Sequence, residues 1–263
     1  MRDNLLSNLN QDRVRQSFRR GLESYHQHAK AQADIAAELV RLLQEQGAPD
    51  RFENVLEFGC GTGHLTLPLM LQFDIHHLTL NDLVPEAAIG LSGLTSDRAE
   101  RTDFTFGPIE TLPLPRDLDL ITSASTVQWI DDVPGLMARL ASRLSPGGWM
   151  AISGFGRNQF HQLRSLGSSA AAPSYIDPSE WQARLPLGLE LLHVGQKPVE
   201  LMFDSAIDLL RHLRNTGVNA QAKQRWSRGR LEAFEESYRS EFGQGRQLPL
   251  TYDPVWMIAR KAR

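Results

Sequence analysis

Two kinds of hydrophobic pattern alternate along this chain, and they predict helices and strands in turn. Between Asp12 and Gln46 the apolar residues recur at helical spacing, which predicts one or two amphipathic helices. From Asn54 onward, short apolar runs alternate with helical stretches, as in a parallel sheet with helices on both faces. The predicted strands are Val55–Phe58, Leu78–Leu80, Phe104–Phe106, Leu118–Thr122 and Met150–Ser153.

Glycine, proline and capping residues divide the next part of the chain. Ser145-Pro146-Gly147-Gly148 predicts a tight turn between a helix over Val133–Leu144 and the following strand. After Phe155 the alternation is lost, and Asp177-Pro178-Ser179-Glu180 predicts a helix start. We interpret this region as an insertion over the active site.

The last third returns to strand-like patterns. Leu189 to Phe203 predicts one strand, a helix with Ile207, Leu210 and Leu213 follows, and Tyr252–Ala259 predicts the last strand. We therefore expect a helical prefix over 1–50, a core over 51–155, lid or recognition segments over 156–188 and 204–245, and closing core strands over 189–203 and 246–263.

Composition narrows the class of protein. With 263 residues, 41% of them hydrophobic, the chain can bury one good core. Its 28 basic and 31 acidic residues give no field that favours nucleic acid or an anionic membrane. A single cysteine, a polar N-terminus and the lack of an apolar run of about 20 residues predict a soluble cytoplasmic enzyme, which we expect to be a monomer.

The glycine-dense segment Gly59-Cys60-Gly61-Thr62-Gly63 lies between a predicted buried strand and a predicted helix. Glycines let a ligand approach the main chain, because they lack Cβ atoms and adopt unusual backbone angles. His64 stands where a dinucleotide-binding loop has its third glycine, and no phosphate-loop motif is present. The turn therefore predicts a cofactor without phosphate, although tight packing alone would also need such glycines.

Two carboxylates flank this turn. Asp82 follows the second predicted strand by one residue, and it lies 82 − 61 = 21 positions beyond the middle glycine, where it could accept both hydroxyls of a ribose. Glu57, at the mouth of the first strand, could orient the turn or meet an ammonium group. S-adenosylmethionine (SAM) has a ribose and an ammonium group, and it carries no phosphate. The alternative for Asp82 is a structural role as a surface residue that starts a turn before Pro85.

These motifs resemble those of class I methyltransferases. Leu56–Gly63 is similar to their first motif, Asp82 to their ribose-binding acid, Ile109–Pro113 with Leu118–Ile121 to their adenine-side motif, and Leu144–Gly148 to the turn before their fifth strand. The resemblance implies a Rossmann-like α/β fold with a seven-stranded, mostly parallel sheet. Pro108 departs from the pattern, since many members have an acid there, which leaves the Ile109 amide as the adenine contact. The implied SAM-binding residues are Glu57, Gly59, Gly61, Gly63, Asp82, Leu83, Ile109 and Glu110.

Segments outside these shared motifs resemble the malonyl-[acyl-carrier protein] O-methyltransferases of biotin synthesis. They are the prefix from Phe18 to Tyr25, Thr126–Trp129, Phe203 through Arg214, and Pro249–Tyr252. The implied reaction methylates the free carboxylate of a malonyl thioester, carried by acyl carrier protein or coenzyme A. A carboxylate is already ionised near pH 7, so positioning and desolvation would supply the rate without an acid or base.

Three residues are candidates for the substrate-facing wall. Gln128 is polar in an apolar context, and Trp129 follows the fourth strand at the end of the sheet where ligands bind. Tyr25 would bring a hydroxyl from the prefix helix. Core packing is the alternative for Trp129, and a half-buried structural role is the alternative for Tyr25.

Arg211 and Arg214 are candidates for docking an acidic carrier protein, because residues three apart share one face of a helix. Exposed arginines are common, so a solvated helix face is the alternative. The histidines show no ligand spacing, and we assign no metal site. Two other functions stay open: methylation of another small carboxylate or a quinone-like ring, and a non-catalytic protein that keeps the fold.

Overall fold

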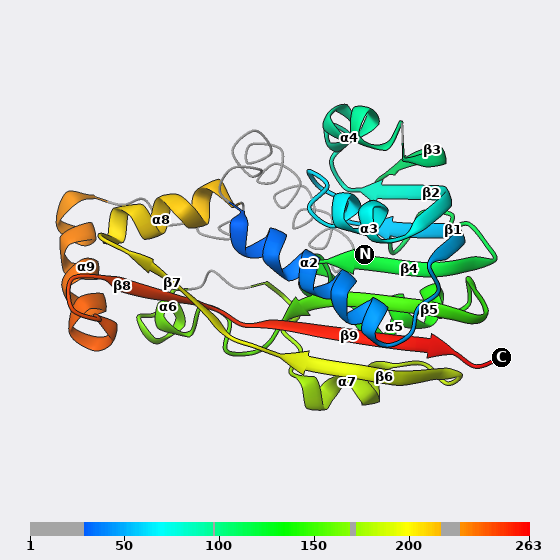
Figure 1. The fold of residues 1–263 in the computed structure, drawn as a ribbon. Coiled ribbons are helices and arrows are strands. Elements are labelled where there is room, and N and C mark those ends of the chain that lie inside the picture. The colour runs from blue at the N-terminus through cyan, green and yellow to red at the C-terminus, as the bar shows by residue number, and fades with distance from the viewer. Residues whose placement is uncertain (1–28, 97, 169–171, 217–226) are drawn as a thin grey trace, which may run out of the picture. The chain divides into compact units, whose positions relative to one another are not determined.

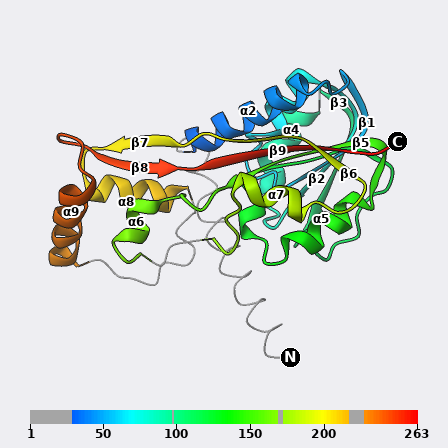
Figure 2. The same ribbon diagram turned by 90° about the horizontal axis from the view of Figure 1, so that it is seen from below.

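A seven-stranded sheet forms the centre of the larger of two units in the chain (Figures 1 and 2). The computed structural model describes residues 29–96, 98–168, 172–216 and 227–263. Residues 30–156, 173–197 and 254–263 make up the core unit. Ala29 and the described residues of 157–172 and 198–253 make up the insert unit.

The strands of the core unit follow the order β3-β2-β1-β4-β5-β9-β6. The first five are parallel to one another, and β9 runs antiparallel to both β5 and β6. This confirms the expected seven-stranded, mostly parallel Rossmann-like sheet. The strands are β1 (Arg51–Phe58), β2 (Asp74–Asp82), β3 (Ala99–Phe106), β4 (Leu118–Ala124), β5 (Leu144–Phe155), β6 (Leu189–Gln196) and β9 (Pro254–Lys261).

Helices cover both faces of this sheet, which is why its central strands are apolar on both sides. Figure 2 shows α2 on one face and α5 and α7 on the other. Trp256 of β9 donates a hydrogen bond from Nε1 to the Ile35 carbonyl of α2 at 2.9 Å. The helices are α2 (Lys30–Glu45), α3 (Thr66–Gln72), α4 (Ala87–Thr95), α5 (Val133–Ala141) and α7 (Pro178–Arg184), with a 3₁₀ turn η1 (Val127–Trp129).

The expected helix start at Asp177 is confirmed, and the helix belongs to the core unit. Its first turn closes through the Asp177 N–H, which donates to Glu180 Oε2 at 3.0 Å. Trp181 is fully buried in the same hydrophobic cluster as strands β4 and β5. Residues 173–188 therefore complete the core, because they bury the large apolar surface of Trp181 in this cluster.

The tight turn predicted at Ser145–Gly148 is wrong. The chain turns at Ser142 and Arg143. The residues from Ser145 to Gly148 form an irregular start to β5, where the pairing with β4 shifts register. Gly147 has φ 80°, which accommodates the bulge. The proline and glycines thus bend a strand instead of preceding it.

The single strand predicted over Leu189–Phe203 is also wrong. It is two strands in two sheets, because Pro198 lacks the N–H that a continuing ladder requires. The strand predicted over Tyr252–Ala259 divides likewise at Asp253. In the insert unit, β7 (Val199–Phe203) and β8 (Leu248–Tyr252) pair antiparallel with each other.

In the described part of the insert unit, three helices pack around this two-stranded sheet: α6 (His161–Ser165), α8 (Ala206–Asn215) and α9 (Arg228–Phe242). Leu209 and Leu213 of α8 are fully buried, whereas Ile207 is exposed. The Tyr238 hydroxyl of α9 donates to the Pro249 carbonyl at 2.7 Å, so this buried phenol is satisfied.

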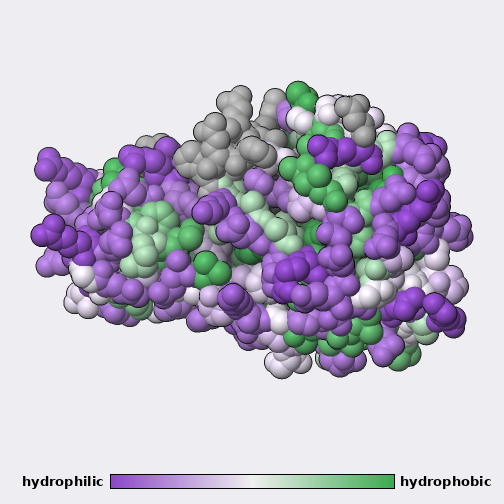
Figure 3. Space-filling view, viewed as in Figure 1, coloured by the Kyte–Doolittle hydropathy of each residue, from purple (hydrophilic) through white to green (hydrophobic). Residues whose placement is uncertain are grey.

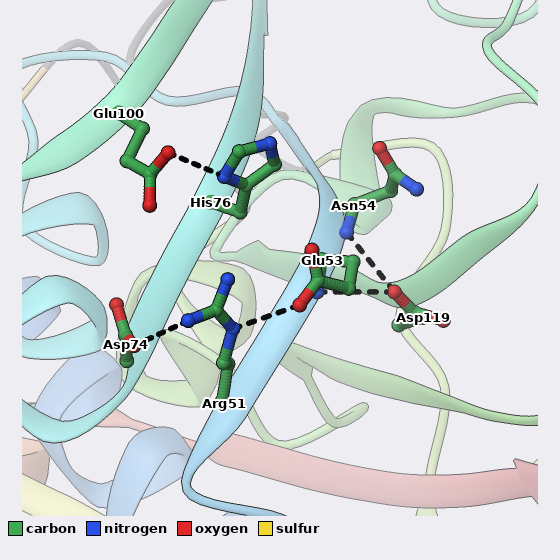
Figure 4. Close-up of polar contacts among 7 residues, drawn as sticks. All are labelled: Arg51, Glu53, Asn54, Asp74, His76, Glu100 and Asp119. Carbon is green, nitrogen blue, oxygen red and sulfur yellow. Dashed lines mark hydrogen bonds and ion pairs between the residues drawn. The ribbon is translucent and has the colours of Figure 1, made fainter.

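The amino-terminal edge of the core sheet is held by carboxylates (Figure 4). Asp119 Oδ2 of β4 accepts the backbone N–H groups of Glu53 and Asn54 in β1, at 3.1 and 3.0 Å. Arg51 reaches both Glu53 and Asp74, in ion pairs exposed enough to contribute little energy. Most of the charged side chains named here form ion pairs with one another.

The surface is mixed in hydropathy. Figure 3 shows one face on which hydrophobic areas are interrupted by hydrophilic ones, as is ordinary for a folded protein. No helix in the described ranges combines the length and the hydropathy that a membrane span needs. The exposed large apolar side chains are Leu71, Ile89, Phe106, Leu187, Val199, Met202 and Ile207.

Candidate cofactor site

The predicted glycine turn joins β1 to α3 at the carboxyl edge of the sheet. Gly59, Gly61 and Gly63 have φ values of 68°, 50° and 87°, which only glycine adopts readily. A Cβ at Gly59 would overlap the Thr126 side chain, and one at Gly63 would meet Leu91. A Cβ at Gly61 would have no atom within 4 Å. Two of the glycines therefore permit close packing, and the middle one leaves open space beside the main chain.

The structure brings Asp82 onto this turn. Asp82 Oδ2 accepts the Gly61 N–H at 2.8 Å, and Oδ1 accepts the Val84 N–H at 2.8 Å. Burial raises the pKa of Asp82, and the backbone N–H groups of Val84, Gly61 and Leu83 oppose the rise. Each oxygen keeps a further lone pair, so the fixed carboxylate could still accept hydroxyl groups.

Glu57 is fully buried, and neither of its carboxyl oxygens has a hydrogen-bond partner among the described residues. Burial raises its pKa to about 8, the facing Thr66 hydroxyl opposes the rise, and the negative charge of Asp82 adds to it. A buried acid without a partner is costly and rare unless a ligand completes it. An ammonium group would supply the missing donors and the opposite charge.

The segment after β3 forms a single tight turn. The Gly107 N–H donates to the Asp82 carbonyl at 3.0 Å, and the Pro108 carbonyl accepts the N–H groups of Thr111 and Leu112. The Ile109 side chain is buried, but nothing in the described part of the chain accepts its N–H. This free donor is consistent with the predicted adenine contact. Leu83 and Glu110 are half-buried at the same edge.

The end of β4 carries a cluster of polar groups. Gln128 is buried and donates from Nε2 to the Ser125 carbonyl at 2.6 Å, while its Oε1 has no partner within the described ranges. Ser125 has φ 54°, an uncommon conformation for a residue with a Cβ, and its buried hydroxyl is also unpaired there. Trp129 is half-buried beside them in η1. Strained backbone and unpaired polar atoms together are typical of a binding site.

Arg211 and Arg214 belong to the insert unit, and Cys60 belongs to the glycine turn itself. Tyr25 falls outside the described residues. Arg211 and Arg214 are exposed on α8 of the insert unit, and Arg211 pairs with Asp208 Oδ1 at 2.6 Å. Cys60 is buried within the turn, and burial raises the pKa of its thiol, which favours the packing role expected for it.

Four further residues shape the site and were not predicted. Ser123 Oγ donates to the Phe58 carbonyl at 2.7 Å, and the Thr126 hydroxyl lies against Gly59. Both, with Ser125, belong to a polar run that follows the apolar part of β4, which is a signal that the sequence contained. Arg139 of α5 hydrogen-bonds the turn after β3, and no sequence pattern indicates it.

Comparisons with known proteins agree with this geometry. The family model described as "Methyltransferase domain" matches residues 26–192. The malonyl-[acyl-carrier protein] O-methyltransferase of Chlorobium luteolum is 37% identical over 94% of each chain. The enzyme of that name from Acinetobacter baylyi is 32% identical over 97% of this chain and 98% of its own.

Solved structures establish the same fold. N-methyltransferase NodS from Bradyrhizobium japonicum, in complex with S-adenosyl-L-homocysteine, superposes with a TM-score of 0.52 at 16% identity, covering 91% of this chain and 99% of its own. The YcgJ protein from Bacillus subtilis gives a TM-score of 0.57 at 16% identity, over 86% and 98% of the two chains.

The sheet order and the glycine turn with its two acids define a class I, SAM-dependent methyltransferase. The resemblance predicted from the motifs is therefore confirmed at the level of the class. More closely, the chain belongs to the malonyl-[acyl-carrier protein] O-methyltransferase family.

The residues present fit SAM. The unpaired Glu57 carboxyl suits the ammonium group, Asp82 suits the ribose, and the open side of Gly61 lets the cofactor approach the backbone. When bound, SAM supplies a methyl group activated by its sulfonium. The chain's own contribution would be to hold and orient this cofactor at the carboxyl edge of the sheet, where ligands bind in other doubly wound folds.

Proposed function

We propose that this enzyme methylates the free carboxylate of a malonyl thioester, with malonyl-acyl carrier protein as its substrate, in the synthesis of biotin. The observation that carries the proposal is where the likeness to the relatives extends. The methyltransferase-domain match ends at residue 192, whereas the named relatives align over 94–97% of the chain. The similarity therefore includes most of the insert unit, the part of the chain that a general cofactor domain does not need.

The polar groups at the end of β4 suit an acceptor that is already an anion. Gln128 uses one N–H on the Ser125 carbonyl and retains a second, and the Ser125 hydroxyl is a further donor. Such donors can fix a carboxylate without protonating it, so its oxygen keeps its nucleophilicity. We assign this positioning role to Gln128, with Trp129 and Tyr25 as walls of the substrate site.

We further propose that Arg211 and Arg214 of α8 contact the carrier protein. Arg211 is about half exposed, and so is its ion-pair partner Asp208, with side-chain exposures of 52% and 46%. A pair this exposed is weak, so an acidic partner can replace Asp208 at little cost. Charges of this kind act mainly on the rate of encounter and on partner choice.

The direct test is to incubate the enzyme with SAM and malonyl-acyl carrier protein and to weigh the carrier by mass spectrometry. We expect one added methyl group that an esterase removes. Malonyl-coenzyme A and a free small dicarboxylate serve as competing acceptors under the same conditions. Faster methylation of the free acid would contradict the thioester assignment, and preference for the coenzyme A thioester would contradict the carrier protein as substrate.

A further inference from the structure

We propose that Arg139 is a positioning residue for the cofactor, which holds the turn after β3 so that the Ile109 N–H meets the adenine ring. Arg139 lies in α5, outside every motif that identifies the class. Its guanidinium donates from Nη1 to the Ile109 carbonyl and from Nη2 to the Leu112 carbonyl. One side chain therefore grips two carbonyls of a single turn.

The helix that carries Arg139 is itself fixed. Leu136, Met137 and Leu140 of α5 are buried in the main hydrophobic cluster, which also contains residues of β1, β4 and β5. A fork of five N–H donors on a rigid helix is well suited to hold two carbonyls in a set geometry. Lysine has one nitrogen and could not hold both at their separate positions equally well.

Among the described residues, only Arg139 hydrogen-bonds the main chain of Ile109, although other contacts hold the rest of the turn and the Ile109 side chain. The Pro108 carbonyl accepts the N–H groups of Thr111 and Leu112, which closes the turn on itself. Pro108 has neither an N–H nor a polar side chain to offer the purine, and its carbonyl already accepts two N–H groups of the turn. The Ile109 N–H is then the donor to the purine. Arg139 holds the carbonyl group of the same residue.

This inference rests on SAM as the cofactor and is independent of the acceptor. It is tested by calorimetric titration of the whole enzyme with S-adenosylhomocysteine and with S-inosylhomocysteine. In the inosyl compound the exocyclic amino group is a carbonyl and the adjacent ring nitrogen bears a proton. The variants are Arg139→Met, Arg139→Lys and the control Arg116→Met, which removes an exposed arginine that forms no hydrogen bond with the described residues of the turn.

We expect Arg139→Met to weaken S-adenosylhomocysteine binding about tenfold, because a misplaced donor loses a hydrogen bond worth roughly 1.4 kcal/mol. The preference of the wild-type enzyme for the adenosyl over the inosyl compound should fall towards one in this variant. Arg139→Lys should restore part of that preference, and Arg116→Met should keep all of it.

Two results would overturn the proposal. One is an unchanged adenosyl-to-inosyl ratio in Arg139→Met, even if the melting temperature falls, because a merely structural role lowers both affinities equally. The other is a wild-type enzyme that binds the two compounds alike, since no purine-edge contact would then exist to be positioned. Titration uses no methyl acceptor, so neither result depends on the malonyl assignment.

Discussion

The buried Glu57 carboxyl should make the stability of the cofactor-free enzyme depend on pH. Its pKa is about 8 in the folded chain, against 4.5 for an exposed glutamate. The folded state therefore keeps a proton that the unfolded state releases between these values. Stability from this group is fully present below pH 4.5 and is lost as pH rises towards 8.

The size of the effect follows from the same two values. Their difference, 8 − 4.5 = 3.5, corresponds to roughly 5 kcal/mol, since each pKa unit is about 1.4 kcal/mol. Glu57→Gln keeps the shape and removes the titration. The variant should therefore gain stability relative to the wild type by up to about 1.4 kcal/mol per pH unit over this range.

The assay is urea unfolding at a series of pH values for the wild type, Glu57→Gln and Glu53→Gln. Glu53 lies on the same strand with 58% of its side chain exposed, so its removal controls for the loss of a charge. Only Glu57→Gln should diverge from the wild type as pH rises. Parallel stability curves for all three proteins would refute the burial argument.

Cofactor binding should remove the proton from the Glu57 carboxyl. At pH 7 a carboxyl with a pKa of about 8 is roughly nine-tenths protonated, and an ammonium partner favours the ionised form. Binding of S-adenosylhomocysteine should therefore release close to one proton, and calorimetry in buffers of different ionisation enthalpy would detect it. A heat that is the same in every buffer would mean that the ammonium group does not meet Glu57.

Three further groups of substitutions test the site and the docking surface. Asp82→Ala should raise the dissociation constant of S-adenosylhomocysteine by one to two orders of magnitude, because the lost bonds contribute roughly 1.5–3 kcal/mol; an unchanged constant would remove Asp82 from the ribose. Gly59→Ala should destabilise the fold by about 2 kcal/mol or more through overlap with its neighbour, whereas Gly61→Ala should cost about 1 kcal/mol in urea unfolding and mainly impair binding; equal losses of stability would contradict this division. Arg211→Glu with Arg214→Glu should raise the KM for malonyl-carrier protein about tenfold and spare the coenzyme A thioester; equal changes for both substrates would exclude docking there.

Part of the fold could be predicted because its signals are local. Val55–Phe58 and Leu78–Leu80 are apolar runs long enough for buried strands, and Asp177 carries its own capping partner three residues later. The pairing of Asp82 with the glycine turn could be predicted from spacing, because parallel strands end at one edge. These inferences require no knowledge of distant contacts.

The errors arose where tertiary pairing overrides local pattern. Nothing in Leu189–Phe203 itself shows that its two parts enter different sheets. Pro198 indicates only that a continuous strand is interrupted there. The glycines after Pro146 are as suitable for a bulge as for a turn, and only the partner strand decides between them. Arg139 could not be found for the same reason, since its contacts join segments that lie far apart in sequence.

The position of β9 has a consequence for how the chain is made. This strand lies between β5 and β6, yet it is the last strand to be synthesised. Until it emerges, β5 has one unpaired edge and β6 has no partner among the described strands. Long-range pairing of this kind is slow and exposes nascent chains to aggregation. The nascent polypeptide should therefore need chaperone protection up to the emergence of residues 254–261, even though the cofactor-binding half of the sheet precedes them.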